Sequence, residues 1–279
     1  MRIFCAYLTC TLAFLVTITG FFTFAWNLTM GELPGSCVAT FLVTYLVIAS
    51  GVSIGFHRYG THRSFYFTSV GKWLARPLFL IAGSLALQSS MRFWCVAHHK
   101  HHQHTDKDGD PHSPYCPGGS LMQKIRQFLW SHMLWIPHFN HSENEFPQWL
   151  KFDWFENLIT RLYLLILLTP LTLIWFYLGW HHLAAYLGAI FIYWHVTASV
   201  NSVTHLFGQR PFKTGDHSGN MFWLAIFSLG EHLHHNHHKS QKSPCFARRW
   251  WEYTVDVGWM QICLLRMFGL VRITPHFNH

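Results

Sequence analysis

Charged residues are scarce in this chain. Asp, Glu, Lys and Arg together make up 11% of the 279 residues, whereas 51% are hydrophobic and 18% are aromatic. In a typical soluble domain about a quarter of the residues are charged. The scarcity of charge therefore excludes an ordinary soluble domain and indicates a membrane protein.

Paired cysteine motifs are also missing. The chain has seven cysteines, an odd number, and no two of them form a C-x-x-C pair. We therefore expect scattered reduced thiols rather than a disulfide framework.

Four segments have almost no charge over a length that can cross a bilayer. About 20 apolar residues span a hydrocarbon core of roughly 30 Å. The four segments are 3–26, 37–56, 159–180 and 183–206, and short loops at 27–36 and near 180–183 join them in pairs. The sequence therefore predicts an all-α polytopic membrane protein with four transmembrane helices in two hairpins. No A-x-A-like cleavage site follows the first segment, so we expect a retained anchor.

Lysine and arginine are absent from both short loops. All 20 lie at the N-terminus, within 57–161 or after residue 206. The positive-inside rule then places both termini in the cytoplasm, together with a helical cap built from 57–158 and 207–279 of a single domain, 1–279. The net charge of +8 follows from this bias, so no nucleic-acid partner is needed to explain it. A cationic face of this kind can hold anionic lipid headgroups or a phosphate-bearing carrier.

Three further apolar stretches are too short or too interrupted to be confident spans. Arg76 and Pro77 interrupt residues 73–90, which we expect to form a buried or interfacial helix. Residues 219–230 and 255–271 are predicted to dock at the membrane interface.

Histidine, by contrast, is abundant, with 23 residues against 12 acids. The tract EHLHHNHHK at 231–239 is the densest group, and such density points to metal binding. An affinity tag or a disordered metal-buffering tail has a similar composition, so the rest of the chain must decide between these interpretations.

Other histidine groups follow the cytoplasmic ends of the apolar segments. Nine imidazoles can converge there if the two hairpins bring these ends to one level: His57, His62, His98, His101, His102, His205, His234, His237 and His238. One H-x-x-H pair in a polar loop is more often solvated than ligating. Repetition of such groups at one membrane face favours a metal centre.

The spacing of the histidines favours two ions. On an α-helix, His98 and His101 are three residues apart and share a face, whereas His102 is rotated by about 100° towards a second ion. The five-residue step from His57 to His62 leaves these two about 140° apart. One ion cannot accept nine imidazoles, but two ions can.

Imidazole ligands suit iron, copper, nickel and zinc, so ligand type alone does not name the metal. Neutral imidazoles without thiolate or carboxylate leave the ionic charge uncompensated, which would favour a strongly oxidising centre. Metal affinity should also fall at mildly acidic pH.

The remaining histidines are expected to play supporting roles. Five that flank the ligands are predicted to be partners of the ligating imidazoles or to be solvated: His99, His104, His112, His232 and His235. We expect His195 to be a satisfied residue inside the helix bundle. His181 and His182 lie on the far side of the membrane and are excluded by topology.

Together the motifs resemble the integral-membrane fatty-acid desaturases of the stearoyl-CoA desaturase type, especially short bacterial members. The resemblance covers about residues 40–270. It rests on HRYGTHRS from His57, the stretch from Trp94 through HHKHH, DPHS from Asp110, NSVTHLFG from Asn201 and GEHLHHNHH from Gly230.

The resemblance implies a four-span bundle whose cap holds two iron ions on the nine histidines, with Asn201 holding one ion through water. It implies oxygen-dependent desaturation of a saturated acyl chain, with formation of a cis double bond at the Δ9 position of an acyl-CoA. A separate donor, such as ferredoxin or a cytochrome with its reductase, would supply two electrons. The implied location is a bacterial inner membrane.

One departure from this family bears on the acyl carrier. Animal members have an Arg-Asp pair before the second histidine box, where this chain has Val96 and Ala97. An acyl chain bound to a lipid is therefore an alternative substrate to the CoA thioester. A fused haem domain with H-P-G-G is not expected, because the nearest string is CPGG at 116–119.

Two other activities are alternatives. A membrane di-iron hydroxylase or ketolase would share the scaffold, but its histidine boxes are spaced differently. A metal transporter would need ligands across the bilayer, and the predicted spans contain essentially only His195.

Overall fold

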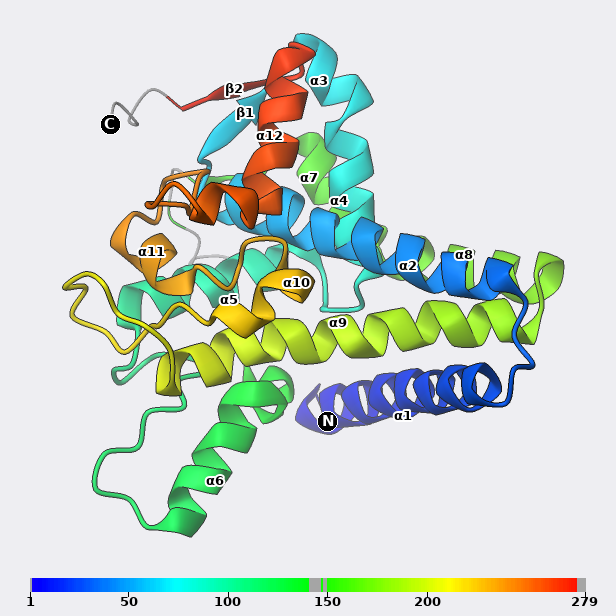
Figure 1. Cartoon of the computed structure of the whole chain (residues 1–279), viewed down its shortest axis with the longest axis horizontal. Coiled ribbons are helices and arrows are strands. Elements are labelled where there is room, and N and C mark those ends of the chain that lie inside the picture. Colours follow the sequence, from blue (N-terminus) through cyan, green and yellow to red (C-terminus); the bar gives the residue numbers. More distant parts are fainter. Residues whose placement is uncertain (1, 141–146, 148–149, 275–279) are drawn as a thin grey trace.

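The computed structural model describes residues 2–140, 147 and 150–274. Parts of the predicted cap, at 141–146, 148–149 and 275–279, lie outside the described residues. The described chain is mostly helical, with one antiparallel pair of short strands, β1 (Phe65–Phe67) and β2 (Val271–Ile273) (Figure 1).

Three helices are long and apolar enough to cross a membrane. They are α1 (Arg2–Thr29), α2 (Gly35–Ser50) continued by the π-helix η1 (Gly51–Thr61), and α9 (Trp180–Leu206). They match the predicted segments 3–26, 37–56 and 183–206. The helix α9 lies between α1 and α2 and packs on both, so the first two helices are held together through the fourth predicted segment (Figure 1).

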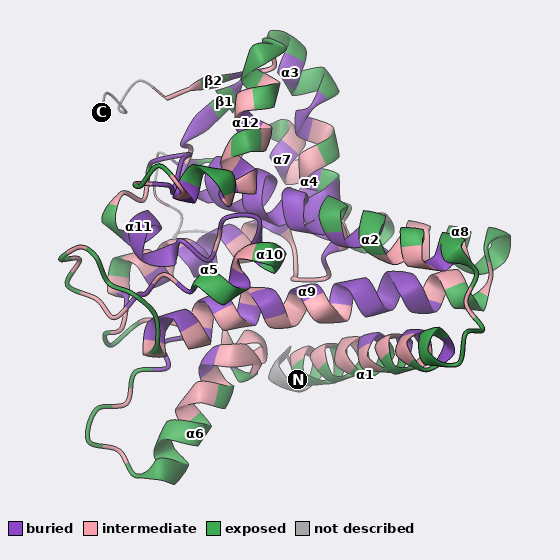
Figure 2. Ribbon diagram, in the orientation of Figure 1, coloured by how far each residue is buried: buried purple, intermediate pink, exposed green. Residues whose placement is uncertain are grey.

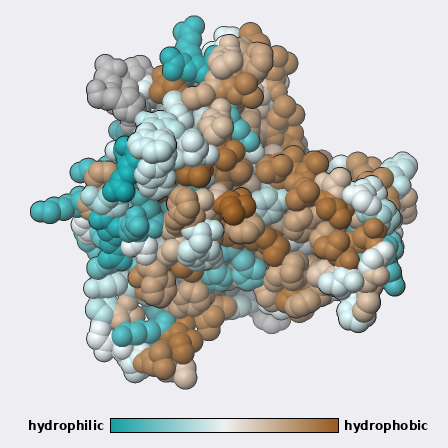
Figure 3. Space-filling view, viewed as in Figure 1, coloured by the Kyte–Doolittle hydropathy of each residue, from teal (hydrophilic) through white to brown (hydrophobic). Residues whose placement is uncertain are grey.

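The pattern of buried and exposed residues along these helices is that of a helix bundle in a membrane. The middle of α9 is largely buried, whereas α1 exposes apolar side chains along much of its length (Figure 2). Brown, apolar surface predominates over the half of the molecule that contains α1, α2 and the start of α9, and most of the hydrophilic surface lies along the opposite edge, on the cap (Figure 3). An apolar band of this kind fits a lipid environment.

The third predicted span, 159–180, is not one straight helix. The chain forms α7 (Trp154–Arg161) and α8 (Tyr163–Tyr177), which meet at Leu162 with a bend of 55°. The helix α8 has 15 residues, about 22 Å at 1.5 Å per residue, which is shorter than a hydrocarbon core. A fourth span exists only if the bent pair counts as one.

The remaining helices and turns form a cap around the end of the bundle that the charge pattern predicts to be cytoplasmic. The stretch 73–90 divides into the end of α3 (Ser69–Leu74) and α4 (Arg76–Leu85), and α4 packs against η1 and α2. The other cap helices are α5 (Met91–His104), α6 (Leu121–Leu129), α10 (Ala225–Ser228), α11 (His234–Lys239) and α12 (Val257–Met267). Short helical turns complete it: η2 (Trp130–Leu134), η3 (Ile136–His138), η6 (Phe222–Leu224) and η7 (Glu252–Thr254).

The junction of α2 and η1 depends on a glycine. A Cβ atom at Gly51 would lie 2.1 Å from the backbone nitrogen of Gly83 in α4. This approach allows η1 and α4 to pack with their backbones almost in contact.

We expect Gly51→Ala to lower the unfolding temperature in detergent, because backbone must move to admit the methyl group. Overpacking of this kind costs about 1–3 kcal/mol. Gly35→Ala is the matched control, since Gly35 is also helical and a Cβ atom added there would meet nothing within 4 Å. Equal unfolding temperatures for the two variants would show that the close crossing is unimportant.

Candidate metal centre

The nine predicted histidines come together in two adjoining clusters. One contains His57, His62, His98, His102 and His237, and the other contains His101, His205, His234 and His238. Within each cluster, one ligand atom per residue lies within 4.8 Å of all the others. Four segments of the chain supply them: η1 with the residue after it, α5, α9 and α11.

The clusters divide the α5 histidines differently from the prediction. His98 groups with His102, and their Nε2 atoms are 3.0 Å apart, whereas His101 joins the other cluster. The expectation that His98 and His101 serve one ion is wrong. A step of four residues turns a helix by about 400°, and therefore aligns side chains better than a step of three, about 300°.

The expected divergence of His57 and His62 is also wrong. Both belong to the five-histidine cluster, with ring centroids 4.9 Å apart. The prediction assumed α-helical winding, but Gly51–Thr61 is a π-helix, in which the backbone nitrogen of His62 bonds to the carbonyl of His57. The wider i→i+5 turn brings residues five apart to the same side.

The ring nitrogens are spaced as ligands of a shared ion would be. In the first cluster, the Nε2 atom of His237 lies 3.1 Å from that of His57 and 2.9 Å from that of His102. In the second, the Nε2 atom of His234 lies 2.9 Å from that of His205 and 3.1 Å from that of His238. Two nitrogens about 2.1 Å from one ion, at right angles, would be about 3 Å apart. The residues present therefore fit a metal in each cluster.

Four carboxylates stand directly behind the clusters and hold the outer nitrogens of four histidines. The Nδ1 atom of His57 lies 2.6 Å from Glu231, and those of His101, His205 and His238 lie 3.0, 3.0 and 3.2 Å from Asp110, Asp106 and Asp216. An Nδ1–H that donates to a carboxylate leaves the lone pair of a neutral imidazole on Nε2, facing the cluster.

The charges of the site are set by burial and by these pairs. Burial, followed by the proximity of other histidines, lowers the pKa of His98, His102, His234 and His237 well below the usual value. Burial opposes ionisation of Glu231, but His57 and Arg58 lower the pKa of this acid to about 2. At neutral pH these four imidazoles are therefore neutral, and Glu231 is ionised.

Sequence reasoning missed these acids. It expected the charge of the ions to be uncompensated, whereas four carboxylates lie one hydrogen bond away from the histidines. Two signals were present: Glu231 opens the last histidine tract, and Asp106 and Asp110 follow the second box within eight residues.

Asp110→Asn is expected to reduce metal affinity. Asp110 accepts from Nδ1 of His101 and also from the backbone nitrogens of Asp106 and His112, so the amide would lose part of the charge that orients His101. Removing such an outer partner typically costs 10–100-fold in affinity or activity. Metal retention against a chelator series measures the effect, with exposed Asp108→Asn as control; equal retention would contradict the assigned role.

Some of the supporting histidines contact the clusters, and others form hydrogen bonds elsewhere. His112 stacks on His101 with ring centroids 4.4 Å apart, and the buried His235 bonds to Ser218 and the backbone of Phe212, away from the clusters. His195 is satisfied by His132, 3.0 Å away. His181 bonds to Asn27 at the opposite end of α9 from His205.

A residue remote in sequence positions α11. The helix has no side-chain cap from its own N-cap residue, Leu233. Instead, Oδ1 of Asn220 accepts from the backbone nitrogens of His235 and Asn236 at 2.9 and 3.2 Å, and its Nδ2 donates to Asn236. This network fixes the helix that carries three of the nine histidines.

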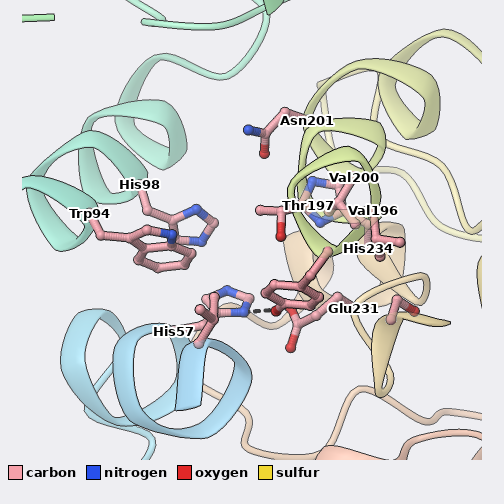
Figure 4. Close-up of a pocket in the computed structure, with 12 residues that line it drawn as sticks. His57, Trp94, His98, Val196, Thr197, Val200, Asn201, Glu231 and His234 are labelled. Atoms are coloured by element: carbon pink, nitrogen blue, oxygen red, sulfur yellow. Dashed lines mark hydrogen bonds and ion pairs between the residues drawn. The ribbon is translucent and has the colours of Figure 1, made fainter. Parts of the chain in front are cut away.

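A small cavity lies beside the clusters. Its volume is about 30 Å³, and His57, His98 and His234 form part of its wall. Val196, Thr197, Val200 and Asn201 of α9 face it, and the amide of Asn201 is directed towards the same space as His98 (Figure 4). Figure 4 also shows the contact between His57 and Glu231.

Comparison with known proteins decides the family. The model of the fatty acid desaturase family matches residues 33–254, a range that includes all nine histidines and Asn201. The chain belongs to the fatty acid desaturase family. It is therefore an oxidoreductase, and its apolar helices agree with a membrane location.

Several curated relatives share about a third of their residues with this desaturase. An sn-1 stearoyl-lipid 9-desaturase of Anabaena variabilis is 35% identical over 242 residues, covering 84% of this chain and 82% of the relative. Delta-9 acyl-lipid desaturase 1 of Arabidopsis thaliana is 33% identical, covering 89% and 75%. An sn-2 palmitoyl-lipid 9-desaturase of Nostoc sp. (strain 36) is 34% identical, covering 80% and 75%.

Proposed function

We propose that this chain is an acyl-lipid Δ9 desaturase. It would introduce a cis double bond into a saturated acyl chain that is esterified to a membrane lipid. The observation that carries the proposal is the pair of histidine clusters beside a cavity with an apolar wall, in a chain whose named relatives act on lipid-bound acyl chains.

The clusters are the proposed sites of two iron ions. The five-histidine cluster would hold one ion, and the four-histidine cluster, with Asn201 acting through water, would hold the other. Iron held there would supply the oxidising power to remove two hydrogens from adjacent methylenes, while one oxygen molecule is reduced to two waters with two external electrons and two protons. The carboxylates at Asp106, Asp110, Asp216 and Glu231 orient the imidazoles and balance the charge.

The walls of the cavity would position the acyl chain. Val52, Val196 and Val200 offer apolar surface, and Trp94 stacks on His98 with ring centroids 4.9 Å apart. These side chains exclude water and hold a methylene segment against the histidines. Because an alkyl chain has no polar handle, its position can be set only by the shape of such a wall.

A lipid carrier is favoured over CoA by the α5 helix. The two positions at which animal members of the stearoyl-CoA desaturase type have an Arg-Asp pair are Val96 and Ala97, which are buried here. They provide neither charge nor surface for a nucleotide carrier. The acyl-CoA interpretation made from sequence is therefore the second candidate.

The remaining partners follow from the same reasoning. We infer that a separate donor, a ferredoxin or a cytochrome with its reductase, delivers the electrons from the cytoplasmic side. Both termini and the cap would face the cytoplasm of a bacterial inner membrane, because the basic residues gather there.

The test is expression in a host that cannot make unsaturated lipids, followed by mass spectrometry of intact phospholipids and of acyl-CoA. We expect a new Δ9 double bond in phospholipid after a pulse of labelled saturated chains that are already esterified. Label that appears first in acyl-CoA would support the CoA alternative. A hydroxylated product without an alkene would favour the hydroxylase alternative and reject the proposal.

A further inference from the structure

The loop from Phe222 to Glu231 leaves the cap and returns to it. The backbone nitrogen of Met221 donates to the carbonyl of His232 at 2.9 Å, so the ends of the loop meet. Between them the chain forms η6 and α10 and carries no charged residue before Glu231. In Figure 1, α10 lies between α2 and α9.

The tip of the loop touches α2 within the apolar length of that helix. The hydroxyl of Tyr45 donates to the carbonyl of Phe227 at 2.7 Å. Tyr45 lies near the middle of the 27-residue apolar helix Gly35–Thr61, and its neighbours Leu46 and Val47 are exposed. Apolar side chains exposed at this level of a spanning helix face lipid.

After Phe227 the chain returns to the histidine clusters. Glu231, four residues after Phe227, contacts His57, which lies twelve residues beyond Tyr45 along the same helix, on the order of 15 Å away. Leu229 and Gly230 have φ angles of +51° and +107°, and these left-handed residues turn the chain. The carbonyl of Leu229 accepts from Gly258 at 2.8 Å, so the returning backbone is satisfied, as a segment at membrane depth requires.

The two sides of the loop differ sharply. Phe222, Trp223, Ile226 and Phe227 are exposed on the outside, and Ile226 is 85% exposed. Ser228 and Glu231 line the cavity on the inside. Only this loop therefore lies between the cavity and the outer surface, which at this point adjoins the exposed apolar side of α2.

The cavity is too small for its substrate as it stands. A volume of about 30 Å³ holds roughly two water-sized spheres, far less than an acyl chain. The other walls are formed by η1, α5 and α9, which pack within the core, whereas the loop consists of two short helical turns exposed on one side.

We propose that residues 222–231 form a re-entrant, lipid-embedded wall through which an acyl chain enters the cavity sideways from the bilayer. The loop inserts its aromatic and aliphatic side chains among lipid tails, and displacement of this wall admits a chain that remains attached to its headgroup. The inference rests on the proposed acyl-lipid activity, because a soluble carrier would not need a lateral entrance.

The depth of the loop can be measured with a spin label. Cys5, Cys10, Cys116 and Cys263 are first replaced by serine, since the other three cysteines are buried. Ile226→Cys is then labelled in phosphatidylcholine vesicles, beside Leu46→Cys on the lipid face of α2 and Lys239→Cys at the exposed end of α11. We expect the label at 226 to resemble that at 46, accessible to oxygen and shielded from a water-soluble nickel chelate. Chelate access equal to that at 239, as an aqueous or protein-docking surface would give, overturns the proposal.

The route is tested with a charge at the same position. Ile226→Glu should lower turnover of phospholipid-borne stearoyl chains by about tenfold or more, because an acid among lipid tails is costly. Its metal content should stay unchanged, and Ile226→Leu should remain within about twofold of the original turnover. Turnover of Ile226→Glu equal to that of Ile226→Leu overturns the lateral route. If the unsubstituted chain acts only on stearoyl-CoA, the proposed function fails instead, whatever depth the label reports.

Discussion

His237→Ala is expected to abolish desaturation. The Nε2 atom of His237 lies about 3 Å from those of both His57 and His102, so the residue links the η1 and α5 parts of its cluster. Loss of an outer partner alone typically costs 10–100-fold, so loss of this inner imidazole should exceed about 100-fold. Metal analysis should show a fall from about two ions per chain to about one, because the four-histidine cluster is intact.

The matched control for this variant is His181→Ala. His181 lies in the same helix as His205 but 24 residues away, about 36 Å along α9, and its ring bonds only to Asn27 among the described residues. This variant should keep most of the activity and both ions. Near-normal turnover by His237→Ala would refute the proposed ligand set, as would equal metal loss in the two variants.

Arg58→Met is expected to have the largest effect on stability. Arg58 is fully buried and joins three parts of the chain: its guanidinium lies 2.9 Å from Glu231 and 2.8 Å from Asp256, and its Nε donates to the carbonyl of Pro244 at 3.0 Å. The guanidinium carbon also lies 3.9 Å from the ring centre of Phe246. Removing one partner of a buried ion pair costs about 3–5 kcal/mol, a large part of a typical folding free energy.

This substitution should also weaken metal binding, because Glu231 would lose the cation that holds it beside His57. Unfolding temperature and metal content in detergent measure the two effects. Arg58→Lys keeps the charge but loses the planar fork, so we expect an intermediate result. Arg272→Met, at an exposed position of β2, should leave both quantities unchanged. An Arg58→Met protein as stable as this control would show that the network does not support the fold.

Hydropathy predicted the long helices well because crossing a bilayer imposes a requirement on each segment by itself. The predicted segments 3–26, 37–56 and 183–206 are all present as apolar helices. The segment 159–180 satisfied the same requirement, yet the chain bends at Leu162. Composition alone does not reveal such a break, and the expected arrangement in two hairpins stays a prediction. Topology and the identity of the ions also stay predictions.

The nine histidines were identifiable because they stand in dense, repeated boxes, and the structure brings all of them together. Their division between two clusters was not predictable from α-helical geometry. The π-helical winding of Gly51–Thr61 depends on packing against neighbours such as α4, and it changes which side His62 faces.

The sequence by itself determined that this protein has long apolar helices and a histidine-rich centre at one end of them. Both features depend on the composition of short, continuous segments of the chain. Only the tertiary structure decided that α9 separates α1 from α2, that Asp106, Asp110, Asp216 and Glu231 stand behind the imidazoles, and that the loop after Met221 returns to the depth of Tyr45. These features join residues up to about 180 positions apart, and such contacts depend on the folded path of the whole chain rather than on any local preference.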